Sequence, residues 1–209
     1  MPSFKLTSTE ALLLLVSVQV AGLVVANAIA GKLVVLGGAV FTAGALAYPV
    51  TYVLQDVISE RWGHRTSSVV VVGGFLGAVV LALYSHVGLL LPAIDAEHAA
   101  AYNAMFAATP RVVVASLTAY LIGGLLDVRV FFAVRALTGQ PHLWLRKCVS
   151  TAVSQLIDSL LFVCIAFWSD LPLSALLSMG LAQYAFKMVC AVGGLPISYT
   201  ILARLRASV

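Results

Sequence analysis

The sequence predicts an all-α membrane protein with six transmembrane helices, folded as a single domain over residues 1–209. Of the 209 residues, 62% are hydrophobic and 10% are charged, whereas an ordinary soluble domain is roughly 45–50% apolar and about 25% charged. Three charge-free stretches, at 11–31, 33–55 and 66–94, each exceed the roughly 18–20 apolar residues that cross a bilayer. This composition excludes a cytosolic enzyme and a disordered chain.

The N-terminal apolar run is interpreted as the first span and not as a signal peptide, because it is about twice the roughly 7–15 residues of a signal peptide's apolar core. Residues 95–109 form the longest predicted connection. Glycines and prolines interrupt the second and sixth spans, and such breaks are tolerated at membrane depth only where protein or a polar cavity satisfies the backbone. The last span is long enough to be tilted, kinked or partly outside the membrane. In chain order, the expected spans are 10–31, 33–57, 66–93, 111–134, 148–168 and 172–203.

The distribution of lysine and arginine predicts that both termini lie in the cytoplasm. With six spans, only Lys32 and Arg111 fall on one side, and Lys187 falls inside a span. The positive-inside rule assigns the richer side to the cytoplasm. This orientation explains the net charge of +4, so no nucleic-acid partner is expected. The basic residues of the richer side are Lys5, Arg61, Arg65, Arg129, Arg135, Arg146, Lys147, Arg204 and Arg206.

Cysteine and histidine spacing predicts no metal site and no cofactor. The three cysteines lie in apolar stretches, and neither they nor the four histidines have the spacing of metal ligands. The chain also contains no glycine-rich phosphate loop, nucleophile elbow, HExxH or CxxC motif. An enzyme is therefore not expected. The residues concerned are Cys148, Cys164, Cys190, His64, His86, His98 and His142.

Two short polar motifs suggest an internal repeat. Gln55 and Asp56 end the second span, and Gln155 and Asp158 lie in the fifth, so each middle element of a three-plus-three arrangement carries an acid and an amide. Three spans per half would make such a repeat inverted, a plan that places the substrate of many transporters near the repeat interface. A 3+3 inverted repeat is one interpretation of this match, and chance similarity is the other.

Ionisable residues at membrane depth are the strongest functional signal, since each costs about 2.5–3.5 kcal/mol to insert. Asp158 and Lys187 lie near the centres of their spans, and Asp127 lies toward the cytoplasmic end of its own. Ser150, Ser154 and Asp158 recur every four residues and form one polar stripe with Thr151 and Gln155. For the serines and threonine, hydrogen bonding between helices is at least as good an explanation as ligand binding. For Asp158 a functional role is favoured.

Two sets of charged residues each permit a structural and a functional interpretation. Asp56 and Glu60 share a helix face and would repel each other unless Arg61 or Arg65 neutralises them; alternatively, Asp56 accepts hydrogen bonds from a substrate while Glu60 is structural. Lys187 is either the internal counter-ion of Asp158 or a partner that Asp158 releases when substrate binds. The sequence leaves both alternatives open.

Taken in order along the chain, several motifs resemble one family, the six-span queuosine precursor transporters of the YhhQ type, also grouped as vitamin uptake transporters. The strongest stretch is 47–63, with AYPVTYVLQDVISERWG, and 27–32 precedes it with NAIAGK. Further matching positions are Arg111, 115–120, 126–128, Arg146, Ser150, Thr151, 154–158, Phe162, Tyr184 and Lys187.

The resemblance implies an importer of 7-deazaguanine bases, the cyano and aminomethyl precursors salvaged for tRNA modification. A carboxylate accepts a guanine-like donor edge in a bidentate manner, which suits Asp158 or Asp56, and the base carbonyl needs a donor such as Gln155, Ser154 or Lys187. Gly123 and Gly124 replace an expected polar residue, which makes Asp127 a less secure ligand. The remaining candidates are Asn27 as a substrate contact, Phe41, Tyr48, Tyr52 and Trp62 as aromatic walls, and Arg111 and Arg146 as gates at the ends of the path.

Three further possibilities stay open at this point. The chain either transports alone or is the substrate-binding subunit of an ATP-driven uptake system, since it carries no nucleotide-binding motif of its own. An intramembrane enzyme or a purely structural protein ranks below both, because no nucleophile–base pair or metal ligands occur at depth. A small nucleobase-like molecule and membrane lipid are the expected partners, and a homodimer is compatible with six helices.

Overall fold

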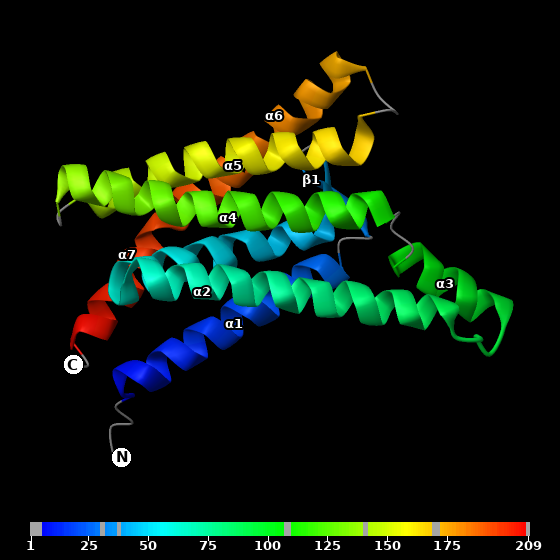
Figure 1. Cartoon of the computed structure of the whole chain (residues 1–209), viewed down its shortest axis with the longest axis horizontal. Coiled ribbons are helices and arrows are strands. Elements are labelled where there is room, and N and C mark those ends of the chain that lie inside the picture. The colour runs from blue at the N-terminus through cyan, green and yellow to red at the C-terminus, as the bar shows by residue number, and fades with distance from the viewer. Residues whose placement is uncertain are drawn as a thin grey trace.

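The computed structural model describes residues 6–29, 32–36, 39–106, 110–139, 142–168 and 172–207, and most of them are helical (Figure 1). Five helical stretches in this part of the chain are long and apolar enough to cross a membrane. The elements are α1 (Ser8–Ala28), β1 (Leu33–Leu36), β2 (Ala39–Thr42), the 3-10 helix η1 (Ala43–Ala47), α2 (Tyr48–Leu90), α3 (Ala96–Phe106), α4 (Pro110–Thr138), α5 (Leu143–Phe167), α6 (Leu173–Gly193) and α7 (Leu195–Ala207).

A capping box starts α1 where the first span is predicted. The Thr7 hydroxyl accepts a hydrogen bond from the backbone N–H of Glu10, and the Glu10 carboxylate accepts one from the backbone N–H of Thr7. Each contact satisfies a donor that a helix N-terminus otherwise leaves unpaired. The charge-free run that follows then continues as helix to Ala28.

The predicted helical span at 33–57 is wrong over its first half. Residues 33–36 and 39–42 pair as antiparallel strands, with Leu33 opposite Thr42 and Leu36 opposite Ala39. The sequence of this segment, LVVLGGAVFT, is rich in β-branched residues around two glycines, a composition typical of a tight hairpin. Hydropathy alone does not distinguish such a hairpin from a helix.

The long helix α2 is a hairpin of two arms that meet at Gly63. Gly63 has φ 87° and ψ 178°, a backbone region open essentially to glycine alone. The Gln55 side chain donates a 2.8 Å hydrogen bond to the Ser67 hydroxyl, and the Ser59 and Ser67 hydroxyls are 2.5 Å apart. In a straight helix, Gln55 and Ser67 would be about 18 Å apart along the axis. The first arm (48–62) and the second arm (64–90) therefore lie side by side and run in opposite directions, as Figure 1 shows.

The helices pack as a bundle in which α4 and α5 make the most extensive contact, followed by α1 with α2 and α5 with α6. Val57 and Phe131 are fully buried and form a core cluster with Val53, Leu143 and Leu202. This cluster joins the first arm of α2 to α4, α5 and α7. In Figure 1 the N-terminus, the C-terminus and the Gly63 turn lie at one end of the bundle, and α3 lies at the other.

Three further boundaries differ from the sequence prediction. The connection predicted at 95–109 contains α3, whose N-terminus is capped by Asp95; hydrogen bonds from the backbone N–H and ring of His98 hold the pKa of Asp95 below its ordinary value. Helix α5 begins at Leu143, five residues before the predicted span, and thereby brings Arg146 and Lys147 into the bundle. The last predicted span is divided at Gly194 into α6 and α7.

Substituting Gly63→Ala is expected to destabilise the protein by about 1–3 kcal/mol, because the turn holds residue 63 at a positive φ that a residue with a Cβ avoids. A Cβ at Gly63 has no atom within 4 Å, so the loss comes from backbone strain and not from a clash. Thermal unfolding in detergent measures it. Gly73→Ala is the matched control, since Gly73 is helical and also has no neighbour within 4 Å; equal melting temperatures for the two variants would contradict the strained turn.

Candidate functional site

A row of buried polar side chains runs through the bundle where the first arm of α2 faces α4 and α5. At the end near the termini, Arg146 donates a 2.8 Å hydrogen bond from its guanidinium to the Glu60 carboxylate, and Arg135 lies 3.9 Å from the same oxygen. Arg146 also donates to the Gly139 carbonyl, and its guanidinium stacks 5.6 Å from the Phe131 ring centroid. Glu60 and Arg146 thus form a buried ion pair between α2 and α5.

The predicted pairing of Glu60 with Arg61 or Arg65 is wrong. The Arg61 guanidinium lies over the Trp62 ring, 5.7 Å from its centroid, and the Arg65 side chain is exposed. The physical reason is the helical hairpin: Arg61 and Arg65 flank the Gly63 turn at the bundle end, whereas Glu60 turns inward to α5. Glu60 pairs with Arg146 instead, and its structural role stays a prediction.

Asp56 and Lys147 form the second buried ion pair, one helical turn deeper. The Lys147 ammonium lies 2.8 Å from the Asp56 carboxylate and donates a hydrogen bond to the Ser198 hydroxyl on α7 at 3.1 Å. Both charged side chains are almost fully buried. Counting Lys147 among the charges of a cytoplasmic loop is therefore wrong. Its spacing to Thr151 and Ser154 places it on the polar stripe of α5, a signal in the sequence that could have revealed it.

Asp127 of α4 completes this cluster from the third side. The Ser154 hydroxyl donates a 2.9 Å hydrogen bond to its carboxyl group, and Ser150 is a second hydroxyl partner. Asp56 and Lys147 are close enough to interact with Asp127 electrostatically. Two carboxyl groups, one ammonium and two hydroxyls thus share a buried region of the bundle.

Asp158 and Lys187 are directly bonded between α5 and α6, with the Lys187 ammonium donating to the Asp158 carboxylate. This contact matches the interpretation of Lys187 as an internal counter-ion. Helix α4 approaches closely here, because a Cβ added at Gly123 would lie only 2.8 Å from the Asp158 Cβ. Gly123 thus occupies the position where a polar side chain was expected, and its lack of a side chain leaves room for Asp158.

Amide groups connect the same region to α1. Gln19 donates a 3.1 Å hydrogen bond to Gln55, whose own amide donates to Ser67. The Tyr52 hydroxyl donates a 3.0 Å hydrogen bond to the Gln155 carbonyl oxygen, which joins the two segments of the suggested repeat. Sequence reasoning missed Gln19, which the structure buries; its signal in the sequence was an amide in the middle of the charge-free run 11–31.

Other predicted site residues lie apart from the row. Asn27 is exposed and donates to the Leu23 carbonyl of its own helix. The Trp62 indole donates to the Ser8 hydroxyl at the turn end of the bundle. Arg111 donates a hydrogen bond to the Ile165 carbonyl at the C-terminal end of α5, where the helix dipole favours a cation. The side chains of Phe41 and Tyr48 are outside the described residues.

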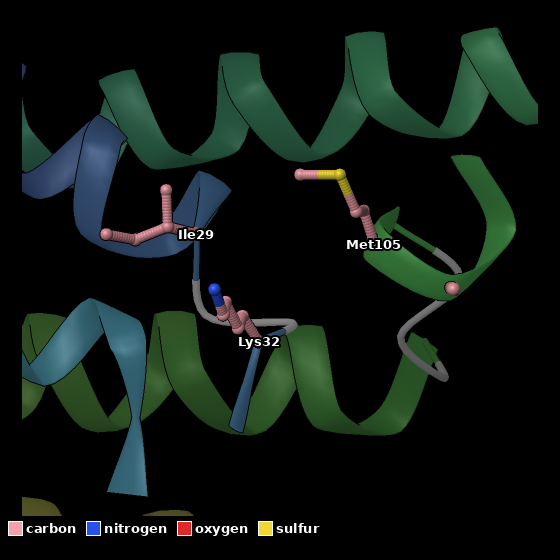
Figure 2. A pocket seen from close by; sticks show the side chains of 4 residues that line it. Ile29, Lys32 and Met105 are labelled. Atoms are coloured by element: carbon pink, nitrogen blue, oxygen red, sulfur yellow. The ribbon is translucent and has the colours of Figure 1, made fainter. Parts of the chain in front are cut away.

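A separate pocket lies at the end of the bundle away from the termini. Its volume is about 310 Å³, and Ile29, Lys32, Ala104 and Met105 line it, between the end of α1 and α3 (Figure 2). The lining residues that the structure describes are mainly apolar, and Lys32 is the one charged residue among them. None of the buried carboxylates described above is among them. Within the described ranges, no group of three or more histidine, cysteine or acidic side chains could hold a metal ion.

Comparison with known proteins identifies the family of the chain. The family described as "Putative vitamin uptake transporter" matches residues 42–201. The chain belongs to this vitamin uptake transporter family. The sequence is 33% identical over 179 residues to a "Probable queuosine precursor transporter" of Bacillus subtilis (strain 168), covering 84% of this chain and 78% of the relative. It is 25% identical over 154 residues to the "Queuosine precursor transporter" of Escherichia coli (strain K12), covering 72% of this chain and 67% of the relative. No solved structure matches the chain significantly.

The family match confirms the resemblance found in the sequence. Together with the long apolar helices, it makes this vitamin uptake transporter a multi-pass bacterial membrane protein. The matched region begins at the last residue of β2 and contains every buried ion pair described above. The polar row therefore lies within the part of the chain that defines the family.

Replacing Lys147 by methionine is expected to destabilise the transporter by about 3–5 kcal/mol, because it leaves the buried Asp56 carboxylate without its cation. The double variant Lys147→Met with Asp56→Asn should recover part of this loss, since no buried charge then remains unpaired. Thermal unfolding of the purified variants measures both effects. Arg65→Met removes an exposed charge and serves as control, with an expected change within about 0.5 kcal/mol. Wild-type stability of the single Lys147 variant would exclude the ion pair.

Proposed function

We propose that this chain imports queuosine precursors, the cyano and aminomethyl 7-deazaguanine bases, across the bacterial inner membrane for salvage into tRNA modification. The names of both relatives support this substrate class. The observation that carries the proposal is the row of carboxylates and amides inside a membrane-spanning bundle. Intramembrane ionisable groups are costly and mark substrate or ion pathways, and a guanine-like base offers hydrogen-bond donors and acceptors that such groups satisfy.

Asp158 is the best candidate for the group that binds the donor edge of the base. Its side chain is 15% exposed, whereas that of Asp56 is 4% exposed and closed off by Lys147. Gln155 lies on the same helix, three residues earlier and therefore on the same face, with its carbonyl oxygen held by Tyr52. In this arrangement Asp158 exchanges Lys187 for the N–H groups of the base, and Lys187 or the Gln155 amide becomes available to the base carbonyl.

Charge and topology support an orientation with both termini in the cytoplasm. Both termini lie at the same end of the bundle as the Gly63 turn (Figure 1), and the excess of lysine and arginine assigned to this side favours the cytoplasm. In this orientation the pocket at Ile29, Lys32 and Met105 (Figure 2) lies toward the outer end of the bundle. We assign it as the outer vestibule, from which a base travels along the polar row to the cytoplasmic end.

Asp158→Asn is expected to weaken equilibrium binding of both 7-deazaguanine precursors at least about tenfold, equivalent to about 1.4 kcal/mol, because an amide cannot accept two hydrogen bonds from the donor edge. Binding is measured on protein purified in detergent, with guanine as a competing base. Asp95→Asn, an exposed carboxylate in the connection before α3, is the matched control and should bind as the wild type does.

Each other outcome of this experiment is informative. A monodisperse, thermally stable wild type that binds none of the bases would exclude the substrate assignment. Equal binding by wild type and Asp158→Asn would retain the substrate class and reduce Asp158 to a structural partner of Lys187. Uptake by the purified chain alone in liposomes would exclude the need for a separate ATP-driven module.

A further inference from the structure

Asp127 differs from the other buried carboxylates of the polar row. Glu60, Asp56 and Asp158 each have a lysine or arginine nitrogen within ion-pair distance. Asp127 is only 9% exposed, and across the described ranges no cationic nitrogen lies within ion-pair distance of it. A carboxylate buried in this way carries an uncompensated charge unless it binds a proton.

The groups around Asp127 are set by the two elements packed against it. From α5, the Ser154 hydroxyl donates to it at 2.9 Å, Ser150 is a second hydroxyl partner, and Lys147 acts at longer range. From α2, the Asp56 carboxylate faces it. Lys147 is already bonded to Asp56 and to a hydroxyl of α7. The cluster therefore has one ammonium, that of Lys147, and two carboxyl groups, those of Asp56 and Asp127. A single proton on one carboxyl group makes its net charge zero.

The same two helices bring this cluster next to the candidate base-binding carboxylate. On α4, Gly123 packs against Asp158, and Asp127 follows Gly123 by four residues. On α5, Ser154 contacts Asp127, and Asp158 follows Ser154 by four residues. Residues four apart are neighbours on one helix face. Adjacent turns of the α4–α5 interface thus hold Asp127 and Asp158, so a change in how these helices pack alters both sites together.

We propose that Asp127 is the binding site of a coupling proton, so that import by this chain is driven by proton symport; this step rests on the proposed function. In the loaded state Asp127 is a neutral carboxylic acid held by the two serines. On the cytoplasmic side its O–H bond breaks, the proton passes to water, and the remaining carboxylate shares the Lys147 ammonium with Asp56. Reprotonation from the outer side restores the neutral cluster.

The first test needs no substrate. Infrared difference spectra of the purified protein detect the carbonyl stretch of a buried protonated carboxylic acid, which moves on exchange into deuterated water. We expect this band in the wild type and in Glu97→Gln, an exposed acid on α3, and its loss in Asp127→Asn. Thermal unfolding verifies that the asparagine variant, which matches the shape of the neutral acid, is folded. A band that is absent from the wild type, or that persists in folded Asp127→Asn, would overturn the proposal.

The second test measures uptake of the two 7-deazaguanine precursors into liposomes containing the purified protein, with and without an acidic exterior. Wild type and Glu97→Gln should accumulate substrate in response to the gradient, and Asp127→Asn should lose this response. An equal gradient response in Asp127→Asn, or none in a wild type that exchanges substrate, overturns proton coupling while the substrate assignment survives. A variant that neither exchanges nor accumulates would make Asp127 a ligand of the base instead. If the wild type transports neither precursor, the proposed function fails, and the infrared band still decides whether Asp127 holds a proton.

Discussion

The structure depends on one constraint, which is that charges taken out of water must find partners inside the bundle. The first arm of α2 carries Asp56 and Glu60, which are four residues apart and so lie on one face. Two adjacent cations of α5 neutralise them: Lys147 pairs with Asp56, and Arg146 pairs with Glu60. Losing either partner leaves a buried charge, which costs several kcal/mol. Because each pair joins the first arm to α5, the two pairs together favour one register of the first arm against α5. The apolar cluster around Phe131 packs in that same register.

Much of the architecture was predictable from hydropathy, and the deviations have identifiable causes. The predicted span at 10–31 differs from α1 by two or three residues at each end, and that at 66–93 lies over the second arm of α2 to a similar precision. The prediction of a helix over 33–57 was wrong in its first half, because hydropathy rises with valine content and does not register the β-branched pattern of residues 33–42. Helix α5 was predicted to begin five residues too late, because Arg146 and Lys147 were assumed to mark a membrane boundary. In this chain the two basic residues do not end the helix, because each pairs with a buried acid of α2.

The candidate site was also predictable only in part: spacing along one helix was informative, whereas contacts between helices were not. The polar stripe of α5 was visible from spacing, and its members Ser154 and Asp158 do meet Asp127 and Lys187. Partners contributed by other helices were not visible, since nothing in the local sequence of Glu60 indicates Arg146, a residue 86 positions away. Gln19 was overlooked for a related reason: its hydrogen-bond partner Gln55 lies on a different helix. Whether six crossings form an inverted repeat stays a prediction.

The hairpin at Gly63 has a consequence for how the chain enters the membrane during synthesis. A first arm of residues 48–62 is about 22 Å long, too short to cross the roughly 30 Å hydrocarbon core, and its acids meet their cations only after α5 has been made. The apolar second arm (64–90), translated immediately afterwards, is the nearest element that can hold the first arm in place. Insertion of the two arms as one unit would let the ribosome continue for dozens of residues before Lys147 and Arg146 arrive. A nascent chain that ends before α5 would keep Asp56 and Glu60 without the cations that neutralise them in the folded protein.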